Sequence, residues 1–260
     1  MNLLVAYKDD PAGYNMAKSL ATDMTLDDGI YTNEWFDLAI ISTPTISADW
    51  LETKYDYDYD GYIFLSKHAA ASGVLSLTCH STGNFADANV GGNPKQVAVP
   101  YPSFQKEYFK NLWNMREQFS KFQITLETTH HGPTALSKPV LFVEIGTTEK
   151  EWNDVTLCSE IANIVQSTLK NTISITPVGI CFGGTHYPKK FTKQILESEY
   201  ALGTIIPKHA LEFLDESLFK HIINQNKDAT VAFLDWSGLG TQKRRINDML
   251  TTTNLEIIKL

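Results

Sequence analysis

Five of the seven histidines lie at or just beyond the end of an apolar run. Two of the five are adjacent, in TTHHGPT at 128–134, and the others lie in SKHAAASG, HSTGN and GGTHYP. A neutral imidazole can act as a general base near pH 7, and three imidazoles can hold a zinc ion that lowers the pKa of its water to about 7. Both chemistries hydrolyse activated carbonyl groups, so the pattern predicts a hydrolase or a transferase.

The loops around these histidines favour a site, although any one histidine taken alone is more often a surface or core residue. The loops are rich in small, hydroxylated and turn-forming residues, which let imidazoles and backbone amides approach a substrate. The chain has no H-E-x-x-H, no G-x-S-x-G and no P-loop. Common metalloprotease, esterase and NTPase signatures are therefore absent from the sequence.

The segments before these loops predict an α/β fold, because short apolar runs alternate with helical periodicity. In a largely parallel sheet, loops at the carboxyl ends of the strands converge in a crevice where ligands bind. We therefore expect His80, His130, His131 and His186 to meet in one crevice. Adjacent residues of an extended loop point in opposite directions, so we expect only one of the paired histidines, His131, to face the substrate. Strands are predicted at 3–7, 37–43, 61–66, 74–79, 139–146, 173–182 and 230–236.

Helical periodicity predicts two long helices that cover this sheet. Aromatic and aliphatic residues spaced by three and four predict a helix over 103–124. Thr148-x-x-Glu151 is a capping box and should open a second helix. The segment YDYDYD at 55–60 alternates with period two, which is more typical of an edge strand or its approach than of a calcium site. The buried stripe of the second helix should include Trp152, Val155, Cys158, Ile161, Ala162, Val165 and Leu169.

Composition limits the class of protein further. At 43% hydrophobic residues, 260 residues can bury a substantial core, and we expect one folded unit over 1–260, a mostly parallel central sheet flanked by helices. Three cysteines without a C-x-x-C pair indicate neither a disulfide framework nor a zinc finger, which favours a reducing cytosol. The N-terminus lacks a basic leader region, and no apolar run approaches the roughly 18 residues of a membrane span. We expect a soluble, cytoplasmic protein.

Net charge argues against broad nucleic-acid binding but leaves room for a local contact. At a formal charge of −8 the chain cannot neutralise many phosphates. Two short basic runs are exceptions, Lys243-Arg244-Arg245 and the cluster of Lys189, Lys190 and Lys193. Such runs are usually solvated surface, so their charge alone does not make them a nucleic-acid site.

Four blocks of the sequence closely resemble the D-aminoacyl-tRNA deacylases of archaea and plants, and they occur in the order of that family. The resemblance implies hydrolysis of the ester that joins a D-amino acid to the 3′ end of tRNA, in a cytoplasmic enzyme that keeps D-residues out of translation. It also implies bound zinc and an α/β fold comparable with peptidyl-tRNA hydrolases and phosphorylases. Resemblance is weaker over 85–102 and after residue 200. The blocks are FLSKHAAASGVLSLTCHSTGN (64–84), TTHHGPT (128–134), PVLFVEIGTTEKEW (139–152) and GICFGGTHYP (179–188).

The family motifs fall on residues to which we assign roles as expectations. An activated ester needs a positioned water, a base and a stabilised oxyanion rather than a covalent nucleophile. We expect the amides near Gly183 and Gly184 to cradle an oxyanion or the terminal phosphate. For Glu144, a role as a solvated or capping carboxylate is about as well supported as a functional one. The threonines need no role beyond forming the loop. The expected catalytic residues are His80, His130, His131 and His186; the zinc ligands are His80, His130, His186 and Glu144; the substrate contacts are Ser66, Lys67, His68, Thr128, Thr129, Thr134, Gly183 and Gly184; and the tRNA contacts are Lys189, Lys190, Lys243, Arg244 and Arg245.

Two other functions stay open at this stage. A metal-dependent hydrolase of small amides or peptides would use the same histidines but would need no basic patch. A non-catalytic binding module would keep the fold and lose turnover. Assays of D- and L-aminoacyl-tRNA against D-dipeptides separate these functions. We expect a monomer, because no obligate protein partner is indicated.

Overall fold

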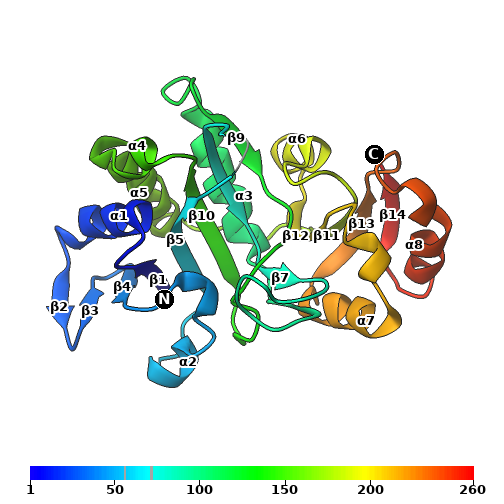
Figure 1. The fold of residues 1–260 in the computed structure, drawn as a ribbon, viewed down its shortest axis with the longest axis horizontal. Helices are drawn as coiled ribbons and strands as arrows, with labels where there is room; N and C mark the ends of the chain where they lie inside the picture. Colours follow the sequence, from blue (N-terminus) through cyan, green and yellow to red (C-terminus); the bar gives the residue numbers. More distant parts are fainter. Residues whose placement is uncertain (56, 71–72) are drawn as a thin grey trace.

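The computed structural model describes residues 1–55, 57–70 and 73–260. Two separate sheets lie side by side, with helices on their faces (Figure 1). The first has eight strands in the order β2-β3-β4-β1-β5-β10-β6-β9 and the second has four in the order β12-β11-β13-β14. The strands of the first sheet are β1 (Asn2–Tyr7), β2 (Thr25–Asp27), β3 (Ile30–Thr32), β4 (Phe36–Ile41), β5 (Tyr62–His68), β6 (Ser76–His80), β9 (Gln123–Leu126) and β10 (Val140–Gly146). Those of the second are β11 (Val178–Phe182), β12 (Ala201–Ile206), β13 (Ala229–Leu234) and β14 (Glu256–Lys259).

Most strand pairs are parallel, so the predicted α/β class with a mostly parallel sheet is confirmed. β4, β1, β5 and β10 run parallel, as do all four strands of the second sheet. The β2–β3 hairpin and the β10–β6 pair are antiparallel. The single central sheet that we expected is two sheets, because β11 to β14 pair only with one another.

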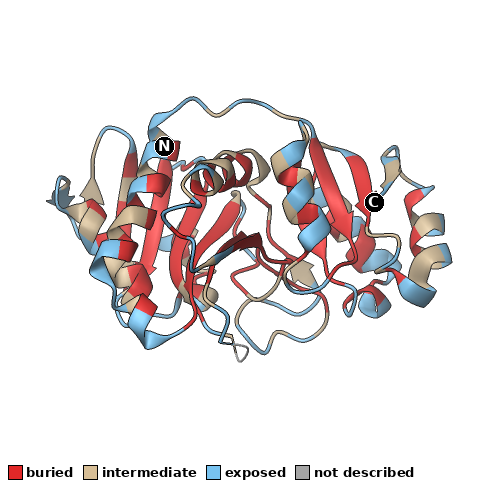
Figure 2. Cartoon of the chain, turned by 90° about the horizontal axis from the view of Figure 1, so that it is seen from above, coloured by how far each residue is buried: buried red, intermediate tan, exposed pale blue. Residues whose placement is uncertain are grey.

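Helices cover both sheets, and a shared core joins them. Buried side chains of β11, β12 and β13 belong to the same hydrophobic cluster as those of the first sheet, and α3 contacts strands of both sheets. The central strands of both sheets are almost wholly buried, whereas β2, β3 and β14 are exposed or half-exposed (Figure 2). No described helix is long and apolar enough to cross a membrane. The helices are α1 (Pro11–Ala21), α2 (Leu51–Lys54), α3 (Pro102–Asn114), α4 (Glu149–Trp152), α5 (Val155–Lys170), α6 (Lys189–Glu197), α7 (Glu216–Gln225) and α8 (Lys243–Leu250).

Both predicted helices are shorter or more interrupted than the sequence pattern suggested. The first, α3, ends at Asn114, and the apolar residues after it pack from turns, since Phe119 is buried outside any helix. The second is divided into α4 and α5, because the Asp154 side chain accepts a hydrogen bond from Leu157 N and caps a new start. Val155 is therefore the first residue of α5 and is 64% exposed, not part of the buried stripe.

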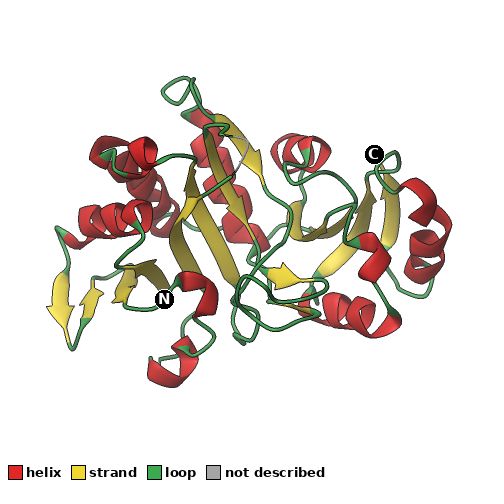
Figure 3. Ribbon diagram, viewed as in Figure 1, coloured by secondary structure: helices red, strands yellow, loops and turns green. Residues whose placement is uncertain are grey.

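Two predicted strands also differ from the structure. Residues 173–177 are irregular, so β11 begins only at Val178. The described part of 55–60 is not a strand but the lead into β5, which is a central strand; Asp56 lies outside the described residues. A short hairpin, β7 (Gly83–Asn84) and β8 (Gln96–Val97), lies between the two sheets together with long loops (Figure 3). Those loops carry the candidate site.

Candidate active site

The site is built on one face of the first sheet, over β5, β10 and β6. In register, Glu144 of β10 lies opposite Ser66 of β5 and Thr78 of β6, while Phe142 lies opposite His80. Because β6 runs antiparallel to β10, its last residue, His80, sits level with the middle of β10. The expectation that all these histidines lie at one carboxyl edge of the sheet is therefore wrong for His80. The imidazole reaches the cluster across the face of the sheet instead.

The TTHHGPT loop is fixed by hydrogen bonds to the second sheet, to the turn at His186 and to the short hairpin strand β7. Thr129 exchanges two bonds with Ile205 of β12, its amide donating to the carbonyl at 2.9 Å and its hydroxyl accepting from the amide at 3.0 Å. The Thr128 amide donates to the His186 carbonyl at 3.0 Å. On the other side, the Gly83 amide donates to the His131 carbonyl at 2.8 Å. The paired histidines are thus held where the two sheets meet.

His131 adopts a left-handed backbone conformation, with φ of 44°. A non-glycine residue rarely does so, and such backbone strain is concentrated at functional sites. This conformation turns the rings of His130 and His131 to the same side, with centroids 4.4 Å apart. The expectation that only one of the two rings faces the substrate is therefore wrong, since both line the same pocket.

Five imidazoles form one continuous cluster. The His80 centroid lies 4.1 Å from that of His130 and 4.8 Å from that of His131. His186 follows at 5.0 Å from His130, and His68 lies 5.7 Å from His186. The structure thus brings together the four histidines expected to converge, and it adds His68. Their chemical roles stay predictions.

Two buried carboxylates lie inside the cluster. Glu144 Oε2 accepts a hydrogen bond from His68 Nδ1 at 3.0 Å and lies 3.8 Å from His80 Nε2, too far for a hydrogen bond. Glu127 is completely buried, with carboxylate oxygens 3.0 Å from His186 Nε2, 3.1 Å from His68 Nδ1 and 3.5 Å from His130 Nε2. Glu127 did not emerge from the sequence pattern. Its one signal is a charged residue directly after the apolar strand QITL.

Three of the histidines have a tautomer that their surroundings fix. Nδ1 of His80, of His130 and of His131 each lies 2.7 to 3.0 Å from a backbone carbonyl, which can only accept a hydrogen bond. Each Nδ1 therefore carries a proton, and in the neutral ring Nε2 presents a lone pair. Such a second hydrogen bond is what orients metal-binding imidazoles in proteins.

Electrostatics keep both carboxylates ionised and the paired histidines neutral. Burial alone would raise the pKa of Glu127, but the His186 imidazole 3.0 Å away and the neighbouring histidines lower it to about 2. The pKa of Glu144 is lowered in the same way by His68 and His80. Burial and the adjacent His80 lower the pKa of His131 to about 4, and burial also lowers that of His130. Burial opposes protonation of His68 and His80, but Glu144 and Glu127 raise the pKa of both.

Possible metal ligands fall into groups that differ from the predicted set. Within each of three groups, one ligand atom per residue lies within 4.8 Å of the others. His186 groups with His68 and Glu127, not with His80 and His130, because Glu127 lies between the imidazoles of His130 and His186. The expected set of His80, His130, His186 and Glu144 is therefore not one compact group among the described residues. The groups are His80, His130 and His131; His68, Glu127 and His186; and His80, Glu127 and Glu144.

A pocket of about 490 Å³ opens beside the histidines. Ser66, Lys67 and His68, expected to contact the substrate, line it together with His130, His131, His186 and Glu144. Other expected contacts are engaged elsewhere. The hydroxyl of Thr129 bonds Ile205, that of Thr134 accepts from Asn93 N at 2.8 Å, and the Thr128 carbonyl holds His130. These three residues are buried and shape the loop.

Of the amides expected to cradle an oxyanion or phosphate, that of Gly183 is already bonded to the protein. The Gly183 amide donates to the Ile206 carbonyl at 2.8 Å, and the Gly184 carbonyl accepts from Lys208 N at 2.9 Å. Both glycines have positive φ, 102° and 88°, so they form the turn that leads from β11 to His186. Their part is to place His186.

Lys190 and Lys243, one residue from each basic run, lie at the carboxyl edge of the second sheet. Lys190 Nζ donates to Asp235 Oδ1 at 2.7 Å and to the Leu260 carbonyl at 2.9 Å. Lys243 and Lys259 lie over the ring of Trp236, at 5.4 and 3.9 Å from its centroid. We call the exposed or half-exposed group of Lys189, Lys243, Lys259 and Trp236 the basic patch. It adjoins the turn to His186, since Gly183 packs against Asp235.

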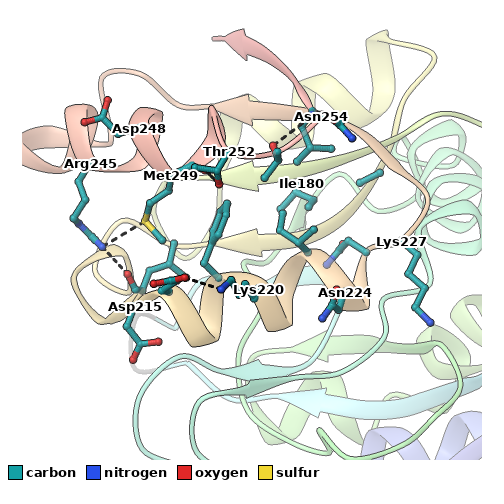
Figure 4. Close-up of a pocket in the computed structure, with 18 of the residues that line it drawn as sticks. Ile180, Asp215, Lys220, Asn224, Lys227, Arg245, Asp248, Met249, Thr252 and Asn254 are labelled. Carbon is teal, nitrogen blue, oxygen red and sulfur yellow. Dashed lines mark hydrogen bonds and ion pairs between the residues drawn. The ribbon is translucent and has the colours of Figure 1, made fainter.

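Arg244 and Arg245 lie away from that patch, in a larger groove of about 1380 Å³ between α7 and α8 (Figure 4). Arg245 donates to the carbonyls of Leu214 and Leu211, which leaves it a structural residue. Arg244 is exposed and lies 3.7 Å from Asp248. Since no described histidine lines this groove, its greater size does not make it the site of the predicted chemistry.

Known proteins of one family resemble this chain in sequence and in fold. The family model of D-aminoacyl-tRNA deacylases matches residues 55–258. The D-aminoacyl-tRNA deacylase of Cenarchaeum symbiosum (strain A) is 54% identical over 258 residues, 99% of each chain. That of Methanocaldococcus jannaschii is 33% identical over 271 aligned positions, covering 98% of this chain and 97% of the relative. Among solved structures, the conserved protein of unknown function AF0625 matches with a TM-score of 0.92 at 28% identity, over 100% of this chain and 95% of that one. The chain belongs to the D-aminoacyl-tRNA deacylase family.

Proposed function

We propose that this protein hydrolyses the ester between a D-amino acid and the 3′ end of tRNA, and so removes D-residues from translation in the cytoplasm. The observation that carries the proposal is the cluster of five imidazoles and two buried carboxylates beside a 490 Å³ pocket, in a chain of this family.

A zinc ion fits the residues of the cluster. Among the described residues, His80 Nε2 and both oxygens of Glu127 are buried without a hydrogen-bond partner, which is costly unless something else satisfies them. Three imidazoles with fixed tautomers, each of which presents an Nε2 lone pair in its neutral form, are a typical zinc donor set. We therefore infer that His80, His130 and His131 hold zinc. The second group, His68, Glu127 and His186, is a further candidate.

Zinc bound there would polarise the ester carbonyl and activate a water molecule. The chain's own residues would do the rest. Glu127, ionised and 3.5 Å from His130 Nε2, accepts the proton of the attacking water. The water oxygen bonds to the acyl carbon, the bond between that carbon and the tRNA 3′-oxygen breaks, and the leaving oxygen takes the proton that Glu127 accepted. His68, held by Glu144 and by Tyr187 at 2.9 Å, keeps the carboxylates in place.

The basic patch supports a path for the tRNA acceptor end. Cations bind phosphates, and an aromatic face can stack on a base. The basic patch combines the two, and its Lys189 follows His186 by three residues. Within the predicted tRNA set, Lys189 and Lys243 are the best placed. Lys190 and Arg245 are already bonded to the protein, and Arg244 lies in the groove between α7 and α8. A few contacts at the acceptor end are compatible with a net charge of −8.

Matched D- and L-tyrosyl-tRNA with and without a chelator test the function. We expect release of D-tyrosine at least about 100-fold faster than of L-tyrosine, and loss of activity when the chelator removes zinc. Mass spectrometry of the native protein should find zinc, and His80→Ala should lose it. His209→Ala, which changes an exposed histidine outside the cluster, is the control. Equal release from both tRNAs, or preferred cleavage of D-dipeptides, would contradict the proposal.

A further inference from the structure

The pocket lies at the point of the first sheet where the order of successive strands reverses. From β1 the chain passes to β4 on one side, and from β4 it returns past β1 to β5 on the other. In open α/β sheets, ligands bind outside the carboxyl ends of the two strands at such a switch point. Here these ends are Tyr7 of β1 and His68 of β5, and both line the pocket. Substrate atoms other than the ester should therefore lie between the two strand ends.

This crevice is acidic where related crevices commonly bind anions. The N-terminus of a helix after the first strand attracts phosphate or carboxylate groups. In this chain Asp10 fills that position, since its carboxylate accepts hydrogen bonds from Gly13 N, Lys67 N and the Ser66 hydroxyl. Asp9 and Glu144 add two further carboxylates to the pocket wall, and Lys67 turns its ammonium over the Trp152 ring at 4.9 Å. The wall therefore favours a cationic group.

Asp9 is the carboxylate that remains available. Glu144 is bonded to His68, and both oxygens of Asp10 are engaged. Asp9 is exposed on the pocket wall, and among the described residues its one hydrogen bond comes from the Tyr7 hydroxyl, to Oδ2 at 2.9 Å. Tyr7 thus orients the carboxylate and leaves Oδ1 able to accept a donor from a ligand.

We propose that Asp9, oriented by Tyr7, binds the α-ammonium group of the aminoacyl ester. The inference rests on the proposed function, because an aminoacyl-tRNA presents one cationic group next to its scissile ester. With the ester carbonyl at the histidines and the ammonium at Asp9, the amino acid is fixed at two points on either side of its chiral carbon. Asp9 is then a specificity-determining residue for the free amine.

The test compares D-tyrosyl-tRNA with N-acetyl-D-tyrosyl-tRNA, which lacks the ammonium charge. In the wild-type protein we expect acetylation to lower kcat/KM about tenfold, the size of one hydrogen bond between charged groups. In Asp9→Asn, kcat/KM for the free amine should fall about tenfold, and the two substrates should become equivalent. Tyr7→Phe should show a smaller loss in the same direction. The control Asp23→Asn removes the same charge beyond the far end of α1, a helix about 16 Å long, and should behave as wild type.

The outcomes separate this inference from the proposed function. If wild-type protein releases D-tyrosine and Asp9→Asn keeps the full preference for the free amine, Asp9 does not bind the ammonium and the proposed function stands. Equal use of both substrates by the wild-type protein overturns the inference as well. If wild-type protein releases D-tyrosine from neither tRNA, the proposed function fails and the inference fails with it.

Discussion

At the scale of single residues, His131 is the side chain whose removal should be most informative. Its ring is one of three that offer an Nε2 lone pair, and it is held by the Gly132 carbonyl and by an edge contact with Phe142. We expect His131→Ala to lower D-tyrosyl-tRNA deacylation at least about 100-fold. Thermal unfolding should change little, because the substitution leaves the hydrogen bonds of the loop backbone intact. A folded variant with near wild-type turnover would place the reactive group elsewhere.

Gly132 tests whether the conformation of the loop matters. A Cβ there would lie 2.3 Å from Gly92 N and 2.4 Å from the Ile46 carbonyl, so Gly132→Ala must push the loop away from its support. We expect a loss of about 1–3 kcal/mol in the free energy of unfolding and a larger loss of activity, measured by urea denaturation and deacylation. Gly29→Ala, at positive φ in open space, should cost stability only. Equal activity losses in the two variants would argue against a positioned loop.

Which site residues could be predicted from sequence depended on residue type. Histidine is rare and titrates near neutral pH, so five histidines in glycine- and serine-rich loops were visible as a group. Glu127 was not, because one glutamate after a strand resembles many surface carboxylates, and only burial among three imidazoles distinguishes it. Backbone conformation was also hidden. Nothing in the letters HHG indicates the positive φ of His131 that turns both rings to one side.

At the scale of elements, Lys106 of α3 is an unusual connection. The side chain is 2% exposed, and its ammonium donates to the carbonyls of Ser198 and Tyr200 at 2.7 Å each, just before β12. It therefore ties the helix between the sheets to the second sheet. We expect Lys106→Met to lower the free energy of unfolding at neutral pH by about 2 kcal/mol, since two carbonyls lose their donor.

The same lysine should make stability depend on alkaline pH. Burial lowers the pKa of Lys106 to about 8 in the folded protein, below the 10.5 of a free lysine. Between these values the unfolded chain binds more protons, so this group makes stability rise as pH increases. Between about pH 7.5 and about pH 10, urea denaturation should show the free energy of unfolding of the wild-type protein rising relative to that of Lys106→Met. A constant difference between the two proteins would mean that Lys106 keeps an ordinary pKa.

Elements were predicted best where burial is continuous. β1, β4, β5, β10 and β13 were each found to within about two residues, because strands of a parallel sheet covered on both faces are unbroken apolar runs. The long helix was overestimated because Phe119 stays buried after the helix ends, and the apolar spacing alone cannot distinguish a helix from packed turns. The break between α4 and α5 depends on the Asp154 cap. The predicted capping box is wrong, since the Thr148 hydroxyl makes no bond to the helix backbone and donates to the Glu151 carboxylate instead.

At the scale of the whole molecule, the site exists only because two sheets meet. Glu127, Thr128 and Thr129 follow β9 of the first sheet, and Thr129 bonds β12 of the second. His186 comes from the end of β11 and completes the cluster at the first sheet. Strand predictions could not show that the chain forms two sheets, because pairing partners are distant in sequence. The carboxyl edge of the second sheet therefore supplies both His186 and the adjacent basic patch.

This arrangement predicts that tRNA binding and bond cleavage can be separated. We expect the combined change of Lys189, Lys243 and Lys259 to Ala to raise KM for D-tyrosyl-tRNA and to leave kcat nearly unchanged, because phosphate contacts act on affinity. The slope of log(kcat/KM) against log salt should shrink by about two to three, close to one for each lost contact. Lys190 and Arg245 are left unchanged because they hold the fold. Lys121, Lys150 and Lys170, exposed lysines outside the basic patch, give a matched control with the same change in charge. If the control and the patch variant lose the same slope, net charge governs tRNA use and the patch has no particular part in it.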